Sequence, residues 1–90
     1  MEMMGGDAII LDVRSQSEFD EGHIPNAVLL PGNEIAQRAE EMLPNKDQTI
    51  LVYCRSGRRS ALAAEELVYL GYTNVYDFGG ILDWTGDVVK

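Results

Sequence analysis

The fold of this chain is decided by residues 49–64, which read TILVYCRSGRRSALAA. The short apolar run Ile50–Tyr53 is typical of a buried strand, and the alanine-rich segment that follows predicts an amphipathic helix with Ser60 as its N-cap. Cys54 is therefore expected on the loop that crosses from a strand to a helix.

The expected position of Cys54 favours an ionised thiol. Backbone N–H groups point inward in a tight loop at a helix N-terminus, and the helix dipole places about half a positive charge there. Arg55, Arg58 and Arg59 add positive charge beside the cysteine. Both effects stabilise a thiolate, so the sequence predicts a lowered pKa for Cys54 and makes it a candidate nucleophile near neutral pH.

The run Cys-Arg-Ser-Gly-Arg-Arg-Ser at residues 54–60, placed after an apolar strand, resembles the active-site loop of rhodanese (sulfurtransferase) domains. Three further motifs match that family in order and approximate spacing. They are Leu11-Asp12-Val13-Arg14 with Glu18-Phe19, the run Gly22-His23-Ile24-Pro25-Asn26-Ala27, and the run Gly79-Gly80-Ile81-Leu82-Asp83-Trp84. The resemblance spans about residues 8–84.

The resemblance implies a small three-layer α/β domain over residues 1–90, with a central, mostly parallel sheet and helices on both faces. Residues 1–7 are expected to be a disordered start. Rhodanese domains usually carry a short strand and a helix ahead of the segment that matches Ala8–Arg14. Relative to that pattern the domain is shortened at its amino terminus.

The order of the predicted elements points to the same α/β class. Strands are expected at residues 8–13, 27–30, 50–53 and 74–78. A short helix is expected after a capping box formed by Ser15 and Glu18, and a second helix over residues 34–43 with Asn33 as its cap. Because strands and helices alternate, the sheet is expected to be parallel.

The helix that follows the cysteine loop is expected to end at Gly71. Its helical spacing predicts one buried face. That face is expected to consist of Ala61, Ala64, Leu67 and Val68.

The mechanism that the resemblance implies is a double displacement on Cys54. The thiolate attacks the outer sulfur of thiosulfate or a similar donor, sulfite leaves, and the resulting persulfide passes its sulfur to cyanide or a thiol. The loop's backbone N–H groups would hold the anionic sulfur, and its arginines would bind the oxyanion end of the donor. The substrate-binding residues would be Arg55, Ser56, Gly57, Arg58, Arg59 and Ser60. No cofactor is implied.

Asp12 and Arg14 are secondary site candidates. They would lie at the same sheet edge as Cys54 if their strands are parallel neighbours, and in the resembled family the matching acid and arginine help to orient the site. A structural ion pair of Arg14 with Asp12 or Glu18 is an equally good interpretation. His23 could deprotonate the thiol, but a bracing role is favoured because the helix terminus already activates Cys54.

The charge and composition of the chain argue against some classes of partner and location. The 90 residues carry a net charge of −8, which argues against nucleic acid as a partner. Three of the seven Lys and Arg residues fall between Arg55 and Arg59, which favours a small anionic substrate at that loop. No apolar run approaches the roughly 20 residues of a membrane helix. A cytoplasmic location is expected, or a periplasmic one if a signal peptide has been removed.

The presence of a single cysteine limits which disulfide, metal-binding and persulfide chemistry the chain can carry out. One cysteine cannot form an internal disulfide, and the only other soft ligand is His23, so no structural metal is expected. A persulfide on Cys54 would have to be discharged by a thiol from outside the molecule, either a small thiol or that of a partner protein.

Three other functions stay open at this stage. The chain could be a sulfur carrier loaded by another enzyme, or a non-catalytic partner-binding module of the same fold. It could also be a cysteine-dependent phosphatase or arsenate reductase. Those phosphatases place five residues between cysteine and arginine, whereas four separate Cys54 from Arg59. They would also need an acid such as Asp12 or Asp83 for the leaving group.

Overall fold

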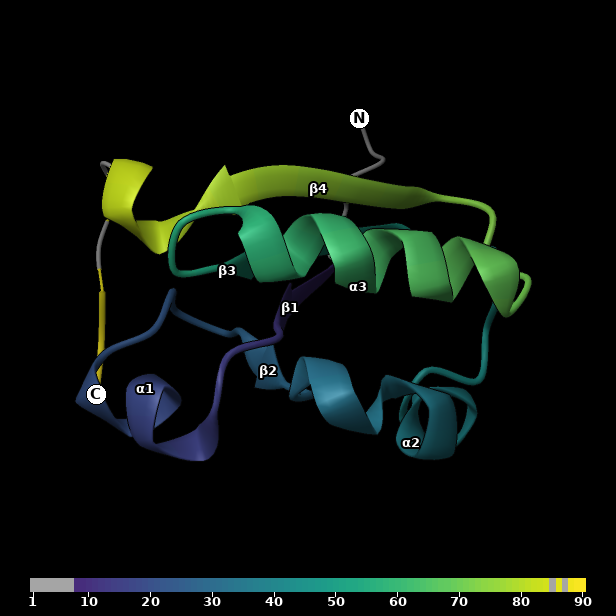
Figure 1. Ribbon diagram of the computed structural model, residues 1–90, viewed down its shortest axis with the longest axis horizontal. Coiled ribbons are helices and arrows are strands. Elements are labelled where there is room, and N and C mark those ends of the chain that lie inside the picture. Colours follow the sequence, from purple (N-terminus) through teal and green to yellow (C-terminus); the bar gives the residue numbers. More distant parts are fainter. Residues whose placement is uncertain (1–7, 85, 87) are drawn as a thin grey trace.

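The computed structural model describes residues 8–84, 86 and 88–90, so the start at residues 1–7 that was expected to be disordered lies outside the described residues. At its centre is a four-stranded sheet in the order β2-β1-β3-β4, in which all paired strands run parallel (Figure 1). The strands are β1 (Ile9–Asp12), β2 (Val28–Leu29), β3 (Ile50–Cys54) and β4 (Val75–Gly80). The predicted α/β class with a parallel sheet is confirmed.

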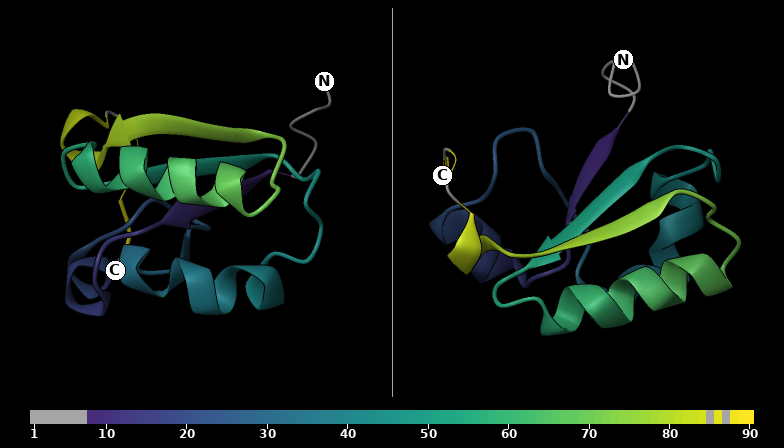
Figure 2. Two further views of the ribbon diagram at one scale, coloured as in Figure 1. Left: turned by 45° about the vertical axis from the view of Figure 1, so that its right-hand side comes forward. Right: turned by 90° about the horizontal axis from the view of Figure 1, so that it is seen from above.

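The two longer helices lie on the same face of the sheet. The helices are α1 (Gln16–Glu21), α2 (Ile35–Met42) and α3 (Arg58–Tyr69), with 3₁₀ turns η1 (Gly32–Glu34) and η2 (Ile81–Asp83). α2 and α3 contact each other, whereas α1 lies near the carboxyl ends of the strands (Figure 2). The predicted three-layer domain with helices around a parallel sheet is confirmed, and α1, with six residues, is its shortest α-helix.

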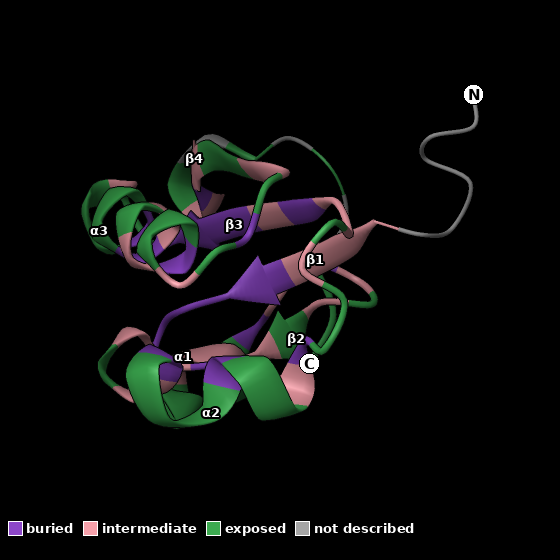
Figure 3. Cartoon of the chain, turned by 90° about the vertical axis from the view of Figure 1, so that its right-hand side faces the viewer, coloured by how far each residue is buried: buried purple, intermediate pink, exposed green. Residues whose placement is uncertain are grey.

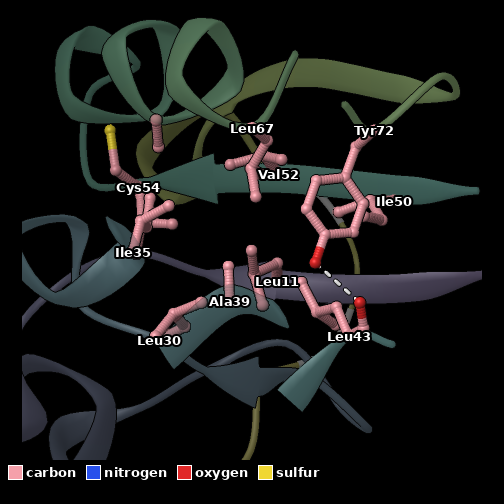
Figure 4. Close-up of a cluster of buried hydrophobic side chains, with 12 residues drawn as sticks. Leu11, Leu30, Ile35, Ala39, Leu43, Ile50, Val52, Cys54, Leu67 and Tyr72 are labelled. Carbon is pink, nitrogen blue, oxygen red and sulfur yellow. Dashed lines mark hydrogen bonds between the residues drawn. The ribbon is translucent and has the colours of Figure 1, made fainter. Parts of the chain in front are cut away.

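The hydrophobic core fills the space between the sheet and helices α2 and α3 (Figure 4). Burial is concentrated in β1 and β3, whereas the outer surfaces of α2 and α3 are exposed (Figure 3). The cluster of buried residues consists of Leu11, Val13, Leu30, Ile35, Ala39, Leu43, Ile50, Val52, Cys54, Ala63, Leu67 and Tyr72. Because Cys54 belongs to this cluster, the candidate nucleophile is anchored by core packing. No helix among the described residues is long and apolar enough to cross a membrane.

The start of α3 corrects the prediction that Ser60 is its N-cap. The helix begins at Arg58, directly after Gly57, whose φ of 103° lies in the left-handed region. Glycine reaches that conformation without steric cost, so the chain turns into the helix earlier than a serine cap would allow. Ser60 lies inside the first turn, with its hydroxyl oxygen 3.0 Å from the carbonyl oxygen of Gly57.

The buried face of α3 also differs from the prediction. Ser60, Ala63 and Leu67 are buried, whereas Ala61 and Val68, which were expected inside, are exposed. Ser60, Ala63 and Leu67 follow the i, i+3, i+7 spacing of one helix face, and from that face the Ser60 hydroxyl contacts Asp77 and Gly79 of β4.

The second helix is confirmed in position but not in its cap. A 3₁₀ turn that includes Asn33 precedes α2, and no side chain caps either element. Asn33 is already part of that turn, so it does not sit at the start of the α-helix as an N-cap must. Ile35, Ala39 and Leu43 lie four residues apart on one helix face, and all three are buried.

Two other helix boundaries follow the sequence signals. Ser15 and Glu18 form the predicted capping box at the start of α1. Gly71, with a φ of 106°, follows the last residues of α3. Both boundaries depend only on neighbours along the chain, which is why the sequence predicts them.

A buried polar network joins β1, β3 and the loop after α1. The carboxylate of Asp12 has no exposed surface and accepts hydrogen bonds from Arg14 Nη2 at 2.8 Å and the Tyr53 hydroxyl at 2.6 Å. Arg14 also donates to the carbonyl oxygen of Gly22, and the Tyr53 hydroxyl oxygen accepts from the backbone N–H of Ile24. Burial, together with the nearby Asp12 carboxylate, raises the pKa of Tyr53 to about 12. The network therefore fixes the loop after α1 against the carboxyl edge of the sheet.

Replacing Tyr53 with phenylalanine should lower the free energy of unfolding by about 1–3 kcal/mol, because Asp12 and the amide of Ile24 each lose a buried partner. Urea denaturation followed by circular dichroism measures the change. Tyr69→Phe is the matched control, since Tyr69 is 88% exposed and should leave stability unchanged. Equal stability of Tyr53→Phe and the original chain would contradict the prediction.

Candidate functional site

Cys54 is the last residue of β3 and lies where the strand meets the loop to α3. It is 1% exposed, and Figure 4 shows it beside Ile35 at the end of the core cluster. The backbone N–H of Gly57 donates a hydrogen bond to the Cys54 sulfur at 3.0 Å. The cysteine is therefore held by packing on one side and met by a backbone donor on the other.

Close contact with β4 holds the loop that follows Cys54. The strand runs on through Gly79 and Gly80, two residues further than expected, with a register shift opposite Val52 and Tyr53. A Cβ atom at Gly80 would overlap the carbonyl oxygen of Arg55, so only glycine allows this approach. The same carbonyl oxygen accepts a hydrogen bond from the backbone N–H of Leu82 at 3.1 Å.

The hydroxyl of Ser60 connects the cysteine loop to β4. Its oxygen lies 2.7 Å from Oδ1 of Asp77 and 3.3 Å from the carbonyl oxygen of Gly79. Asp77 Oδ1 also accepts from the backbone N–H of Gly79, which shapes the bend into the two glycines. Asp77 is the site neighbour that sequence reasoning missed. Its only sequence signal is its position two residues before the Gly-Gly pair.

Opposing effects act on the pKa of the Cys54 thiol. Burial raises it, and hydrogen bonds from the backbone and hydroxyl of Ser60 and from the backbone of Gly57 and Arg59 lower it. The donors prevail, so the pKa lies below the usual value for a thiol. This is the direction that the sequence predicts. Because those donors come from a helix N-terminus and its loop, no separate base is needed to form the thiolate.

The three loop arginines do not share one environment. All three are exposed. Arg59 donates two hydrogen bonds to the carboxylate of Glu18, at 2.8 and 2.9 Å. Within the part of the chain that the structure describes, the side chains of Arg55 and Arg58 have no hydrogen-bond or ion-pair partner. These two arginines are therefore available to an anion at the mouth of the loop.

Asp12 and Arg14 lie under the site and do not contact the cysteine sulfur. They form the buried ion pair described above, with Nη2 of Arg14 2.8 Å from Oδ2 of Asp12. The alternative pairing of Arg14 with Glu18 does not occur, since Glu18 binds Arg59. A carboxylate held in this way cannot serve as a mobile general acid, and the side chain of Asp83 lies outside the described residues.

His23 braces the loop after α1. Its Nδ1 atom lies 2.9 Å from the carbonyl oxygen of Phe19, and the two rings stack with centroids 3.7 Å apart. Its backbone pairs with that of Val89 in an antiparallel bridge. These contacts agree with the bracing role that the sequence favours.

A cavity of about 560 Å³ adjoins the cysteine loop between α1, η1 and α3. Val13 and Ala63, which belong to the same buried cluster as Cys54, lie on its apolar side. Arg59 and Glu66 of α3 contribute charged side chains. The described residues contain no group of three or more His, Cys, Asp or Glu side chains that could hold a metal ion.

Comparisons with known proteins agree on one family. The family model described as a rhodanese-like domain matches residues 1–87. Thiosulfate sulfurtransferase PspE of Escherichia coli (strain K12) is 37% identical over 80 residues, which cover 89% of this chain and 77% of that protein. The putative sulfur carrier protein YrkF of Bacillus subtilis (strain 168) is 41% identical over 78 residues, which cover 86% of this chain but only 41% of that protein.

Solved structures show the same similarity. A structure described as a rhodanese with anions from E. coli superposes with a TM-score of 0.86 at 35% identity, covering 92% of this chain and 98% of that one. A rhodanese-related protein from Thermoplasma volcanium gives a TM-score of 0.82 at 34% identity, covering 97% and 88%. The fold and the sequence motifs thus point to the same group of proteins.

Replacing Gly80 with alanine should displace the Arg55 carbonyl and lower the free energy of unfolding by about 1–3 kcal/mol, because the added methyl group has no space. It should also slow alkylation of Cys54 by iodoacetamide, since the loop that supplies its N–H donors shifts. Gly32→Ala is the control for stability, because its Cβ atom would lie 3.7 Å from its nearest neighbour. An unchanged stability and an unchanged alkylation rate would show that the close approach at Gly80 is not required.

Replacing Ser60 with alanine should raise the pKa of Cys54, because one of the donors that lower it is removed. The midpoint of the pH profile for iodoacetamide alkylation should move up, and the rate at pH 7 should fall. Ser17→Ala is the control, since Ser17 is exposed and, among the described residues, its hydroxyl is hydrogen-bonded to Ser15 alone. A midpoint that stays in place would exclude the Ser60 hydroxyl as a source of thiolate stabilisation.

Proposed function

Because this chain belongs to the rhodanese-like domain family, we propose that it is a sulfurtransferase that moves sulfane sulfur from thiosulfate or a similar anionic donor to a thiol or cyanide. The observation that carries this proposal is the environment of Cys54. The thiol sits at a helix N-terminus with a backbone N–H 3.0 Å from its sulfur and a pKa below its usual value. A thiolate at neutral pH is the nucleophile that sulfur transfer needs.

In the first half-reaction the Cys54 thiolate attacks the outer sulfur of thiosulfate. A bond forms between the two sulfur atoms, the bond from the outer sulfur to the sulfonate sulfur breaks with its electron pair, and sulfite leaves. Arg55 and Arg58 would bind the oxyanion end of the donor, because their side chains are exposed at the loop. The N–H groups that lower the pKa of the thiol would then hold the charge of the persulfide.

In the second half-reaction a thiolate or cyanide attacks the outer sulfur of the persulfide, and the electron pair returns to Cys54. The chain has one cysteine, so the acceptor thiol comes from another molecule. That requirement favours a compartment in which thiols stay reduced, such as the cytoplasm.

A sulfur carrier is the second candidate function, and the relative named as a putative sulfur carrier supports it. In that case another protein would load Cys54, and thiosulfate would be a poor donor. A phosphatase is favoured less, because Glu18 occupies Arg59 and because Asp12 is buried in an ion pair. A phosphate-binding arginine and a leaving-group acid are both required for that chemistry.

The test is the intact mass of the reduced protein after incubation with thiosulfate. We expect the gain of one sulfur atom, its loss on addition of cyanide or a thiol, and no gain in Cys54→Ala. A folded protein that gains no sulfur from thiosulfate but gains one from a protein persulfide would support the carrier function instead. No gain from either donor would overturn sulfur transfer and leave partner binding or phosphatase activity to be assayed.

A further inference from the structure

An ion pair with Glu18 of α1 fixes the orientation of Arg59, one of the three arginines in the loop that follows Cys54. Arg59 Nη1 lies 2.8 Å from Oε1 of Glu18, and Nη2 lies 2.9 Å from Oε2, so both carboxylate oxygens are bound by one guanidinium. The pair connects α1 with the first turn of α3, across 41 residues of sequence. This geometry uses the paired donors of the arginine side chain that would otherwise bind an oxyanion.

Glu18 is itself fixed in place. Its Oε1 atom accepts from the backbone N–H of Ser15 at 3.0 Å and lies 3.1 Å from the Ser15 hydroxyl. Arg59 is the main reason that the pKa of Glu18 is lowered to about 2, so the carboxylate keeps its charge throughout the neutral range. A carboxylate that is held by its own helix cap and stays charged is a permanent partner for Arg59.

The pair contributes little to stability by ordinary measures. The side chain of Arg59 is 44% exposed and that of Glu18 is 27% exposed. Ion pairs at this level of exposure are screened by water and salt and typically contribute little to folding. Its clearer consequence is electrostatic, because it neutralises one of the three arginines in the loop that surrounds Cys54.

We propose that Glu18 is a specificity-determining residue that withholds Arg59 from ligands of Cys54 and so limits the preference of the site for highly charged anions. This rests on the proposed function for its biological meaning. With Arg59 occupied, Arg55 and Arg58 supply the positive charge at the loop. The site then favours a dianionic donor such as thiosulfate less strongly than its three arginines would allow, and it tolerates donors of lower charge.

The test compares two alkylating reagents that differ in charge but react by the same displacement at Cys54. Iodoacetate is an anion and iodoacetamide is neutral, so the ratio of their rate constants reports the local potential and cancels the fraction of thiolate. In Glu18→Gln we expect this ratio to rise about threefold, as one freed positive charge near the sulfur predicts. Glutamine still fits the capping box, so α1 should keep its start.

Two further variants separate this effect from a general change of charge. Glu40→Gln removes one negative charge and breaks the ion pair with Lys46, but Glu40 lies on α2. The ratio of the two alkylation rate constants in this variant should therefore match that of the original chain. Arg59→Ala removes the arginine, and in that background Glu18→Gln should raise the ratio less than in the original chain. Circular dichroism confirms that each variant is folded.

The inference would be overturned if the ratio of the two alkylation rate constants in Glu18→Gln equalled that in Glu40→Gln. It would also be overturned if Glu18→Gln raised this ratio by the same factor in the presence and in the absence of Arg59. Alkylation does not depend on sulfur transfer, so this result stands even if thiosulfate fails to load Cys54. If thiosulfate does load it, the kcat/KM for thiosulfate should rise in Glu18→Gln by a similar factor, with no change in Glu40→Gln.

Discussion

The carboxylate of Asp12, which has no exposed surface, is the constraint on which the site architecture depends. A buried charge is costly unless it is paired and fully hydrogen-bonded, and here Arg14 and the Tyr53 hydroxyl supply the partners. Each partner makes one further bond, to Gly22 or to Ile24, in the loop after α1. Satisfying one charge thus joins two neighbouring strands and a loop beneath the edge where Cys54 ends β3. Asp12 and Arg14 belong to this framework and make no hydrogen bond to the sulfur of Cys54.

Above that framework, backbone geometry decides the chemistry of Cys54. Burial alone would raise the pKa of a thiol and leave it inert. The left-handed Gly57 turns the chain so tightly that N–H groups of the loop face the sulfur, and Gly80 leaves room for that loop beside β4. The donors outweigh burial, and a cysteine that packs in the core also has a lowered pKa. The two effects coexist because one side of the residue faces apolar side chains and the other faces backbone amides.

Electrostatics at the site operates against an acidic background. The chain carries a net charge of −8, so the three arginines of the loop form a local positive region in an acidic protein. In the structure these arginines have different partners. Arg59 pairs with Glu18, while Arg55 and Arg58 extend from the loop. The number of arginines near a nucleophile is therefore a poor measure of the positive charge that a ligand encounters. The partners of each arginine have to be known as well.

Much of this protein was determined by the sequence alone, because the deciding signals are local. The apolar strand before Cys54, the alternation of elements, the capping box of Ser15 and Glu18 and the stop at Gly71 each depend on neighbours along the chain, and all are present in the structure. Only the tertiary structure decided which face of α3 is buried, that Gly57 and not Ser60 starts it, that Arg59 binds Glu18, and that Asp77 reaches Ser60. The start of α3 depends on the left-handed conformation that Gly57 adopts in the folded loop. The other three outcomes depend on groups that are distant in sequence, or on how closely a helix can approach the sheet. Periodicity and spacing along a chain carry no information about either.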